Sequence, residues 1–165
     1  MSWCSSGGIS RGAVNQQINV VSTHLHFDHA GGNTLRDADG EVRVAFPRAR
    51  HVVQKGEFEY AHRDNERIRA SYLPHNYDPV MAAGRMELLE GDVQIVPGVH
   101  VRRTPGHTPY HQSVLIRSAG QTACFLADVM PTTAHLPLPW IMGYDVEPLV
   151  TLESKRTLVE QAREE

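Results

Sequence analysis

The amino-acid sequence predicts an α+β fold, in which short strands form a layered sheet and helices pack outside it. Three observations favour this class. The 165 residues are enough for one domain and too few for two ordinary ones. Hydrophobic residues make up 41% of the chain and charged residues 21%, as in ordinary globular proteins. Short β-branched runs, separated by Gly and Pro, occur in the same chain as segments of helical character.

The first half of the chain mixes strands with one helix. Its Ser- and Gly-rich start lacks apolar spacing, and we expect residues 1–15 to be disordered. β-Branched runs mark strands, Gly-Gly marks a turn, and a charged segment with weak apolar spacing favours a helix. The expected elements are a strand over 18–23, a tight turn over 30–33 that can open a short helix, a strand over 42–46 and a helix over 54–70.

The second half is dominated by short strands between Gly and Pro residues. These strands are expected over 85–89, 93–96, 99–104, 112–117 and 122–127. Cys124 lies in the last apolar run and is expected to be a buried thiol. Glu147 and Pro148 are helix-start signals. A terminal helix is therefore predicted, with one apolar face formed by Leu149, Leu152, Val159 and Ala162.

Composition excludes several classes of function. The formal net charge of −3 does not suggest the basic surface that nucleic acid or an anionic membrane would require. No run is apolar and long enough to span a bilayer, and the start lacks the apolar core of a signal peptide. Two cysteines do not make a disulfide framework, which fits a reducing compartment. These features predict a cytoplasmic protein that binds neither nucleic acid nor membrane.

The chemistry of the chain is concentrated in the run His24-Leu25-His26-Phe27-Asp28-His29. On an extended strand, residues two apart point to the same side, so His24 and His26 can converge on one cation. As the chain turns, Asp28 and His29 can face a second position beside the first. Imidazole nitrogens and carboxylate oxygens suit zinc, and also iron or manganese. The alternative is that these are polar loop residues without a metal.

Two later motifs extend this cluster. Thr104-Pro105-Gly106-His107-Thr108 ends a strand with a Pro-Gly turn and presents His107 at its tip. Alone, His107 would be interpreted as a surface histidine, but beside a cluster that lacks a third nitrogen it becomes a candidate ligand. Asp128 ends a buried apolar strand, where a carboxylate must be paired, capped or bound to metal. Capping a helix is the alternative role of Asp128.

In order and spacing, these motifs resemble those of the metallo-β-lactamase superfamily. The match runs from about Ile18 through Asp145, and the residues after His107 and Asp128 are most similar to the lactonase-like branch. The resemblance implies a partial αββα sandwich and two zinc ions per complete site. It also implies the ligand sets: His24, His26 and His107 for the first ion, Asp28 and His29 for the second, and Asp128 bridging the two.

The chain departs from the family pattern at both ends. Family members have strands before the first motif and supply one more histidine to the second site after the bridging Asp. Here few residues precede His24, and His135 lies too close to Asp128 to match the final ligand. We therefore expect an incomplete domain over 1–165, without the N-terminal strands and the C-terminal segment. Uncovered strand edges would favour aggregation or a homo-oligomer.

The resemblance implies a hydrolase acting on a small molecule. A cation lowers the pKa of a bound water to about 7, and the resulting hydroxide would attack the carbonyl carbon of a lactone or ester. Asp28 would orient the nucleophile. The alternatives are a thioester hydrolase of the glyoxalase II type and a truncated, non-catalytic metal-binding fragment.

Several other residues are candidates for the pocket. Tyr110 and Tyr144 can donate to a substrate oxygen, with packing as their alternative role. The run Leu136–Met142 can form an apolar wall for an acyl chain or a Pro-stiffened connection over the core. His135 is a candidate pocket residue. The remaining histidines are expected to be surface or structural residues: His51, His62, His75, His100 and His111.

Overall fold

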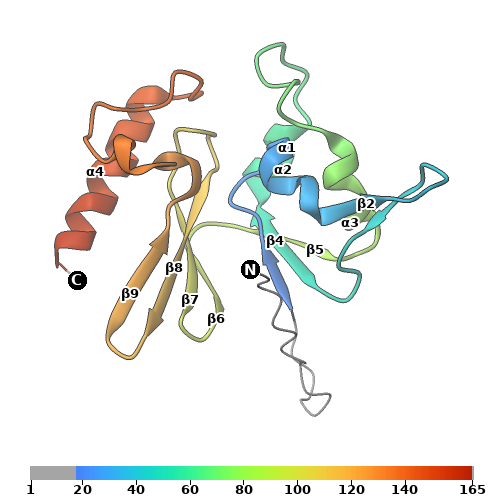
Figure 1. Ribbon diagram of the computed structural model, residues 1–165, viewed down its shortest axis with the longest axis horizontal. Coiled ribbons are helices and arrows are strands. Elements are labelled where there is room, and N and C mark those ends of the chain that lie inside the picture. Colours follow the sequence, from blue (N-terminus) through green and yellow to red (C-terminus); the bar gives the residue numbers. More distant parts are fainter. Residues whose placement is uncertain (1–17, 165) are drawn as a thin grey trace, which may run out of the picture.

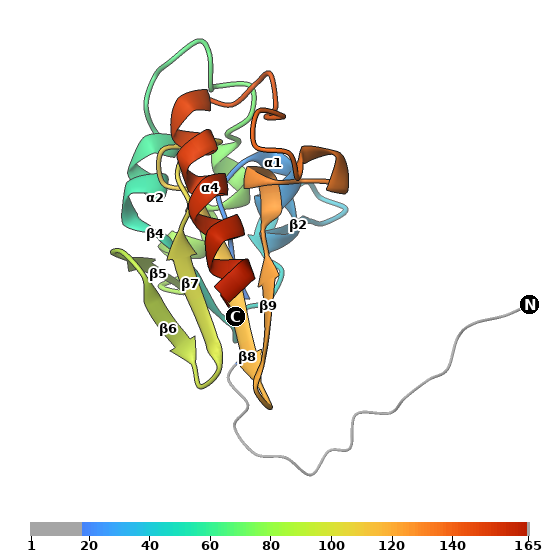
Figure 2. The same ribbon diagram turned by 90° about the vertical axis from the view of Figure 1, so that its left-hand side faces the viewer.

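A computed structural model describes residues 18–164, so the expectation for residues 1–15 lies outside the described part. Two β-sheets face one another, and helices cover their outer sides (Figures 1 and 2). The short helices from the first half of the chain lie beyond one sheet, and the terminal helix lies beyond the other. The chain completes the first sheet and its helices before it enters the second sheet. This helix–sheet–sheet–helix layering confirms the expected fold class.

The first sheet is parallel and has the strand order β1-β4-β5. Parallel neighbours require crossover connections, which here contain the short helices and an antiparallel ribbon of β2 and β3. The elements are β1 (Asn19–Val21), α1 (Phe27–Ala30), η1 (Gly31–Asn33), β2 (Thr34–Arg36), β3 (Val42–Val44), β4 (Arg50–Gln54), α2 (Lys55–Ala61), η2 (Pro74–Asn76), α3 (Asp78–Ala82) and β5 (Met86–Leu89).

The second sheet is an antiparallel meander with the order β6-β7-β8-β9. Its strands are β6 (Val93–Val96), β7 (Val99–Arg103), β8 (Gln112–Ser118) and β9 (Gln121–Phe125). Two short 3-10 turns follow, η3 (Ala127–Val129) and η4 (Thr133–His135), and α4 (Pro148–Glu164) ends the described chain. Glycines at positive φ allow the tight reversals between these strands, as at Gly98 with φ 82°.

The core follows from the alternation of side chains along β4. Val52 points between the sheets, where it packs with Leu89 of the first sheet and Val101 of the second. Val53 points the other way, into the cluster under α2 that contains Leu25 and Tyr77. One strand thus holds the two sheets together and anchors the helical layer, because successive side chains point to opposite faces.

The predicted strands over 18–23, 42–46 and 85–127 are confirmed, most of them a residue or two shorter than expected. The predicted helix over 54–70 is wrong beyond Ala61, and Gln54 belongs to β4, which was not expected. Asn65 explains the interruption, because its side chain accepts from the backbone N–H of Arg67 at 2.8 Å and forms a turn. Ile68 then fills the core from that loop.

Two other expectations are also wrong. Cys124 is exposed, because β9 is an edge strand that pairs only with β8 among the described residues. Leu149 is 77% exposed, and α4 instead buries Thr151, Lys155 and Leu158. Lys155 is tolerated there because its ammonium group donates to three backbone carbonyls, those of Pro137, Leu138 and Trp140. An apolar pattern does not predict a lysine whose charge is solvated by a loop.

Within the described residues, no helix has the length and apolar character needed to cross a membrane.

Candidate metal centre

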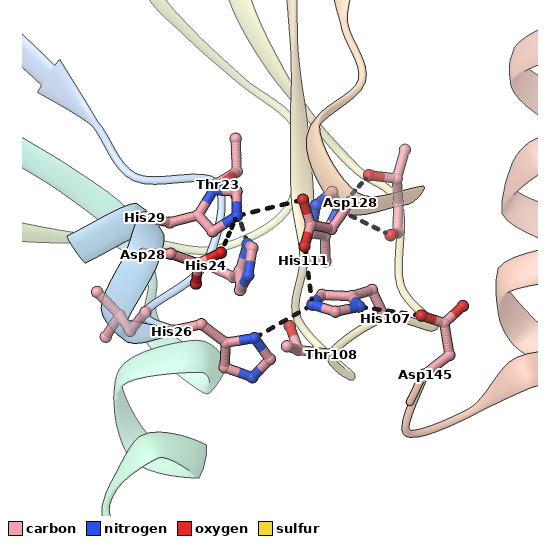
Figure 3. Close-up of polar contacts among 12 residues, drawn as sticks. Thr23, His24, His26, Asp28, His29, His107, Thr108, His111, Asp128 and Asp145 are labelled. Atoms are coloured by element: carbon pink, nitrogen blue, oxygen red, sulfur yellow. Dashed lines mark hydrogen bonds and ion pairs between the residues drawn. The ribbon is translucent and has the colours of Figure 1, made fainter. Parts of the chain in front are cut away.

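The predicted metal ligands meet at one end of the facing sheets, and they come from three separate segments (Figure 3). The chain leaving β1 carries His24 and His26, and α1 carries Asp28 and His29. The turn between β7 and β8 carries His107, and η3 carries Asp128 directly after β9. All six predicted metal ligands therefore lie in one cluster.

The direction of the two imidazoles in the segment His24-Leu25-His26 follows from the alternation of side chains along an extended chain. Leu25 is fully buried and packs into the core under α2, so the flanking imidazoles turn to the opposite side. Their ring centroids lie 4.6 Å apart. The backbone N–H of Phe27 then donates to the Ser71 carbonyl at 2.8 Å, which fixes the start of α1. A buried leucine thus sets the direction of both histidines.

A first group of candidate ligands contains His24, His26 and His107. One nitrogen from each of these residues lies within 4.8 Å of the others. Within this group, His107 Nε2 lies 3.1 Å from His26 Nδ1. Three imidazole nitrogens that converge in this way are a typical ligand set for zinc.

A second group contains His24, His29 and Asp128, and their ligand atoms also lie within 4.8 Å of one another. Asp128 lies between the groups: its Oδ1 is 3.2 Å from His29 Nε2, and its Oδ2 is 3.3 Å from His107 Nε2. Asp28 is less enclosed, with a side chain 58% exposed and Oδ2 at 3.6 Å from His29 Nε2. Asp128 therefore has the geometry of a bridge between two positions.

The electrostatics favour neutral imidazoles at two members of the first group, His24 and His26. Burial lowers the pKa of His24 well below its usual value, and burial together with His107 lowers the pKa of His26 to about 4. His29 differs: burial opposes its charged form, but hydrogen bonding to Asp128 prevails and raises its pKa. The same contact prevails over burial in lowering the pKa of Asp128. A neutral imidazole has the free electron pair that a cation requires.

The residues present fit a divalent cation. His24 Nε2 is buried and has no hydrogen-bond partner, although buried polar atoms normally have one. The other ring nitrogen, Nδ1, lies 3.2 Å from Thr23 Oγ1. When the His24 Nδ1–H donates to Thr23, the lone pair on Nε2 faces the cluster. A cation among these nitrogens and carboxylate oxygens would satisfy that atom.

Asp145 is a residue of the site that the sequence did not reveal. Its buried Oδ1 lies 2.9 Å from His107 Nδ1. Because a carboxylate can only accept, His107 Nδ1 carries the proton and Nε2 presents its lone pair to the cluster. The two residues are 38 positions apart, so no local motif links them. The backbone bond from Val146 N–H to the His107 carbonyl, at 3.2 Å, brings them together.

We expect Asp145→Asn to weaken metal binding about 10- to 100-fold, as is typical when a partner of a ligating histidine is changed. The amide can present an N–H to His107 Nδ1 and so favour the wrong tautomer. Competition with a chromophoric chelator measures the affinity. An Asp145→Asn protein that is folded and binds zinc as tightly as the wild type would exclude a role of Asp145 in orienting His107.

His111 lies at the site, where the sequence suggested only a surface or structural residue. It is fully buried, and its ring centroid is 5.2 Å from that of His24. Its Nδ1 lies 2.9 Å from Thr104 Oγ1, and Thr104 Oγ1 lies 2.9 Å from Ser113 Oγ. Burial lowers the pKa of His111 to about 3. The sequence feature that could have identified His111 is its position, four residues after the predicted ligand His107.

Of the remaining candidates Tyr110, Tyr144 and His135, only Tyr144 lies close to the cluster. Tyr110 packs against Gly56, away from the cluster, and its ring centroid lies 5.6 Å from the Arg103 guanidinium carbon. It is therefore not placed to donate a hydrogen bond to a substrate at the cluster. Tyr144 stays close, with its ring centroid 5.9 Å from that of His107. His135 bonds to Thr132 at 2.8 Å and does not line the site pocket.

The other histidines have no place in the cluster. His51 is buried in β4 near the Phe46 carbonyl, and exposed His62 bonds to Asp78. His75 lies in η2, and His100 lies in β7. The expectation of surface or structural roles for these four agrees with their positions.

A pocket of about 260 Å³ opens over the candidate ligands. It is lined by polar and by apolar or aromatic side chains: His26, Asp28, Arg67, Ser71 and Asp128 among the first, and Phe27, Ile68, Tyr144 and Val146 among the second. The run Leu136–Met142, one expected wall, does not line this pocket. Lys155 holds the backbone of that run, which therefore serves as a connection.

Comparisons with known proteins identify relatives of the chain. Residues 11–164 match the model of the metallo-beta-lactamase superfamily. An N-acyl homoserine lactonase from a Bacillus species is 41% identical over 100 residues, which are 60% of this chain and 32% of that protein.

Two solved structures are similar over most of the described chain. A probable metal-dependent hydrolase from Staphylococcus aureus superposes with a TM-score of 0.77 at 33% identity, covering 86% of this chain and 49% of that one. An N-acyl homoserine lactone hydrolase with N-hexanoyl-L-homoserine bound at its catalytic metal centre gives 0.67 at 30% identity, covering 90% and 52%. The chain thus spans between about a third and about half the length of these relatives.

Proposed function

The chain belongs to the metallo-beta-lactamase superfamily, and from this membership and its site we propose that it acts in a metal-dependent hydrolase that opens a small-molecule lactone. The observation that carries the proposal is the convergence of His24, His26 and His107 beside the bridging carboxylate of Asp128. The names of the relatives support a lactone as the substrate, because several are N-acyl homoserine lactonases.

In the proposed site, two cations are held by the ligands that the sequence suggested. His24, His26 and His107 would hold the first, Asp28 and His29 would hold the second, and Asp128 would join both. Zinc suits this donor set best, and iron or manganese are also compatible. When bound, such cations make water more acidic and polarise a carbonyl group.

The chain's own residues supply orientation and proton transfer. Asp28 lines the pocket and is exposed enough to accept a proton from the attacking water. Burial and the neighbouring Asp128 raise the pKa of Tyr144, so its phenol keeps the proton that it can donate to a substrate oxygen. Phe27, Ile68 and Val146 give an acyl chain an apolar surface. The water oxygen bonds to the carbonyl carbon, the ring C–O bond breaks, and a hydroxy acid is released.

The test is hydrolysis of N-hexanoyl homoserine lactone by purified, zinc-loaded protein, followed by proton release at constant pH. We expect turnover that a chelator abolishes and added zinc restores. A glutathione thioester is the matched control substrate, because it represents the alternative chemistry of the glyoxalase II type.

Two outcomes would contradict the proposal. Turnover of the thioester but not of the lactone would assign the site to thioester hydrolysis. Zinc-loaded protein that hydrolyses neither compound would leave a metal-binding protein without the proposed activity.

A further inference from the structure

Glu57 is a buried carboxylate that neither the metal motifs nor the comparisons explain. It lies in the first turn of α2, and the residue is completely inaccessible to solvent. Within residues 18–164, no lysine or arginine forms an ion pair with it. A buried charge without a partner is strongly destabilising, so a carboxylate in this position requires compensation.

Three hydrogen-bond donors converge on the Glu57 carboxylate. Oε1 accepts from the backbone N–H of Leu25 at 3.0 Å and from the Tyr72 hydroxyl at 2.8 Å. Oε2 accepts from the Thr108 hydroxyl at 2.7 Å. One carboxylate therefore uses both oxygens to join three segments that are remote in sequence.

Each of these donors is next to a candidate metal ligand. Leu25 stands between His24 and His26, and Thr108 directly follows His107. The ring of Tyr72 packs edge-on against His26, with centroids 4.7 Å apart. The two halves of the first ligand group are thus tied to the same carboxylate, one through a backbone amide and the other through a hydroxyl.

The negative charge of Glu57 would be balanced by the positive charge of cations at the metal centre. Burial raises the pKa of Glu57, whereas the three hydrogen bonds that it accepts and, more weakly, the electrostatic interaction with His107 favour its ionised form. Cations held by His107 and its neighbours would act in the same direction and more strongly. With Asp28, Asp128 and Asp145, Glu57 gives four carboxylates around the cluster, equal in charge to two divalent cations.

We propose that Glu57 is a charged positioning residue, which holds the His24–His26 segment and the His107 turn at a fixed separation and balances the positive charge of the centre. This role rests on the proposed metal centre but does not require that the substrate be a lactone. Glu57 does not line the pocket and acts only through the ligands.

Glu57→Gln separates charge from shape. The glutamine oxygen can still accept from Leu25 and Tyr72, and its amide can donate to Thr108, whose hydroxyl can turn to accept. The variant therefore keeps the connections and loses the negative charge. We expect Co²⁺ affinity to fall about 10- to 100-fold, with a changed visible absorption spectrum of the bound Co²⁺.

Single hydroxyl deletions provide a matched comparison. Tyr72→Phe and Thr108→Val each remove one donor to Glu57 and should weaken Co²⁺ binding in the same direction, by less than Glu57→Gln. Tyr77→Phe is the control, because Tyr77 is buried in the same core but donates to the Ala61 carbonyl at 3.3 Å. It should bind Co²⁺ with the affinity and spectrum of the wild type.

Co²⁺ titration of the four variants, with folding checked by circular dichroism, decides the proposal. A folded Glu57→Gln protein with wild-type affinity and spectrum would overturn it. If Glu57→Gln does not fold, unchanged Co²⁺ binding by both Tyr72→Phe and Thr108→Val would overturn it instead. If the wild-type chain binds no Co²⁺, both the proposed metal centre and the role of Glu57 are wrong. If it binds Co²⁺ but does not hydrolyse a lactone, only the proposed reaction is wrong.

Discussion

Replacement of His107 by alanine is expected to lower the metal content by one ion per chain. The affinity for that ion should fall by more than roughly 100-fold, the upper range for loss of a residue that only orients a ligating histidine. The imidazole supplies a nitrogen of the first ligand group, and its Nε2 also contacts Asp128 at 3.3 Å. Its loss leaves the buried Asp145 carboxylate without its donor, which costs a further 1–3 kcal/mol or so of stability. Elemental analysis after gel filtration measures the metal content.

The matched control for His107→Ala is His62→Ala, because His62 is an exposed histidine outside the cluster that bonds to Asp78. This variant should retain the metal content of the wild type. If the loss of stability in His107→Ala prevents purification, His26→Ala removes another nitrogen of the same group from a less buried position. Unchanged metal content in a folded His107→Ala protein would exclude His107 from the site.

Replacement of Gly106 by alanine is expected to destabilise the fold by about 2–5 kcal/mol, from backbone strain and overpacking together. Gly106 has φ 134°, which an L-residue rarely adopts. A Cβ atom there would lie 2.3 Å from the backbone nitrogen of Thr151, at the start of α4. Because Glu147 N–H also donates to the Gly106 carbonyl at 2.8 Å, the strain would act directly on the contact between α4 and the His107 turn.

Urea denaturation of the metal-free protein measures this effect without the contribution of metal binding. Gly143→Ala is the control, since a Cβ at Gly143 would meet no atom within 4 Å. That variant should unfold at nearly the wild-type urea concentration. Equal stability of Gly106→Ala and the wild type would mean that α4 does not pack on the turn as described.

The candidate ligands could be predicted because metal binding requires particular residue types at short spacings. The alternation of His24 and His26 about a buried leucine is a local property of an extended chain. The convergence of His107 and Asp128 on that segment is not local. The missing third nitrogen made His107 a candidate ligand, and the family resemblance implied the role of both residues. The structure brings the three segments together where the resemblance implied.

The supporting residues could not be predicted in this way. Glu57 and Asp145 are single acidic residues in segments without a motif. The partners of Glu57 lie 15, 32 and 51 positions away, and the partner of Asp145 lies 38 positions away. Their burial depends on how α2 and the segment before α4 pack against the sheets. Lys155 illustrates the same limit, since its three acceptors are backbone carbonyls that no residue type marks.

The fold was predictable where side chains alternate and less so where loops or edges decide exposure. The strands of the second sheet were expected nearly in their observed positions. The thiol of Cys124 was misplaced because an apolar run was equated with burial, whereas β9 lies at the edge of its sheet. The helix over 54–70 was too long because the turn at Asn65 interrupts a segment whose composition is otherwise helical.

The most direct test of the two-cation site is anomalous X-ray scattering at the zinc absorption edge from crystals of the zinc-loaded protein. We expect one peak among His24, His26 and His107, and a second beside His29, Asp28 and Asp128. Zinc-loaded crystals without a peak among His24, His26 and His107, or with peaks only at other residues, would contradict the metal centre proposed for this chain.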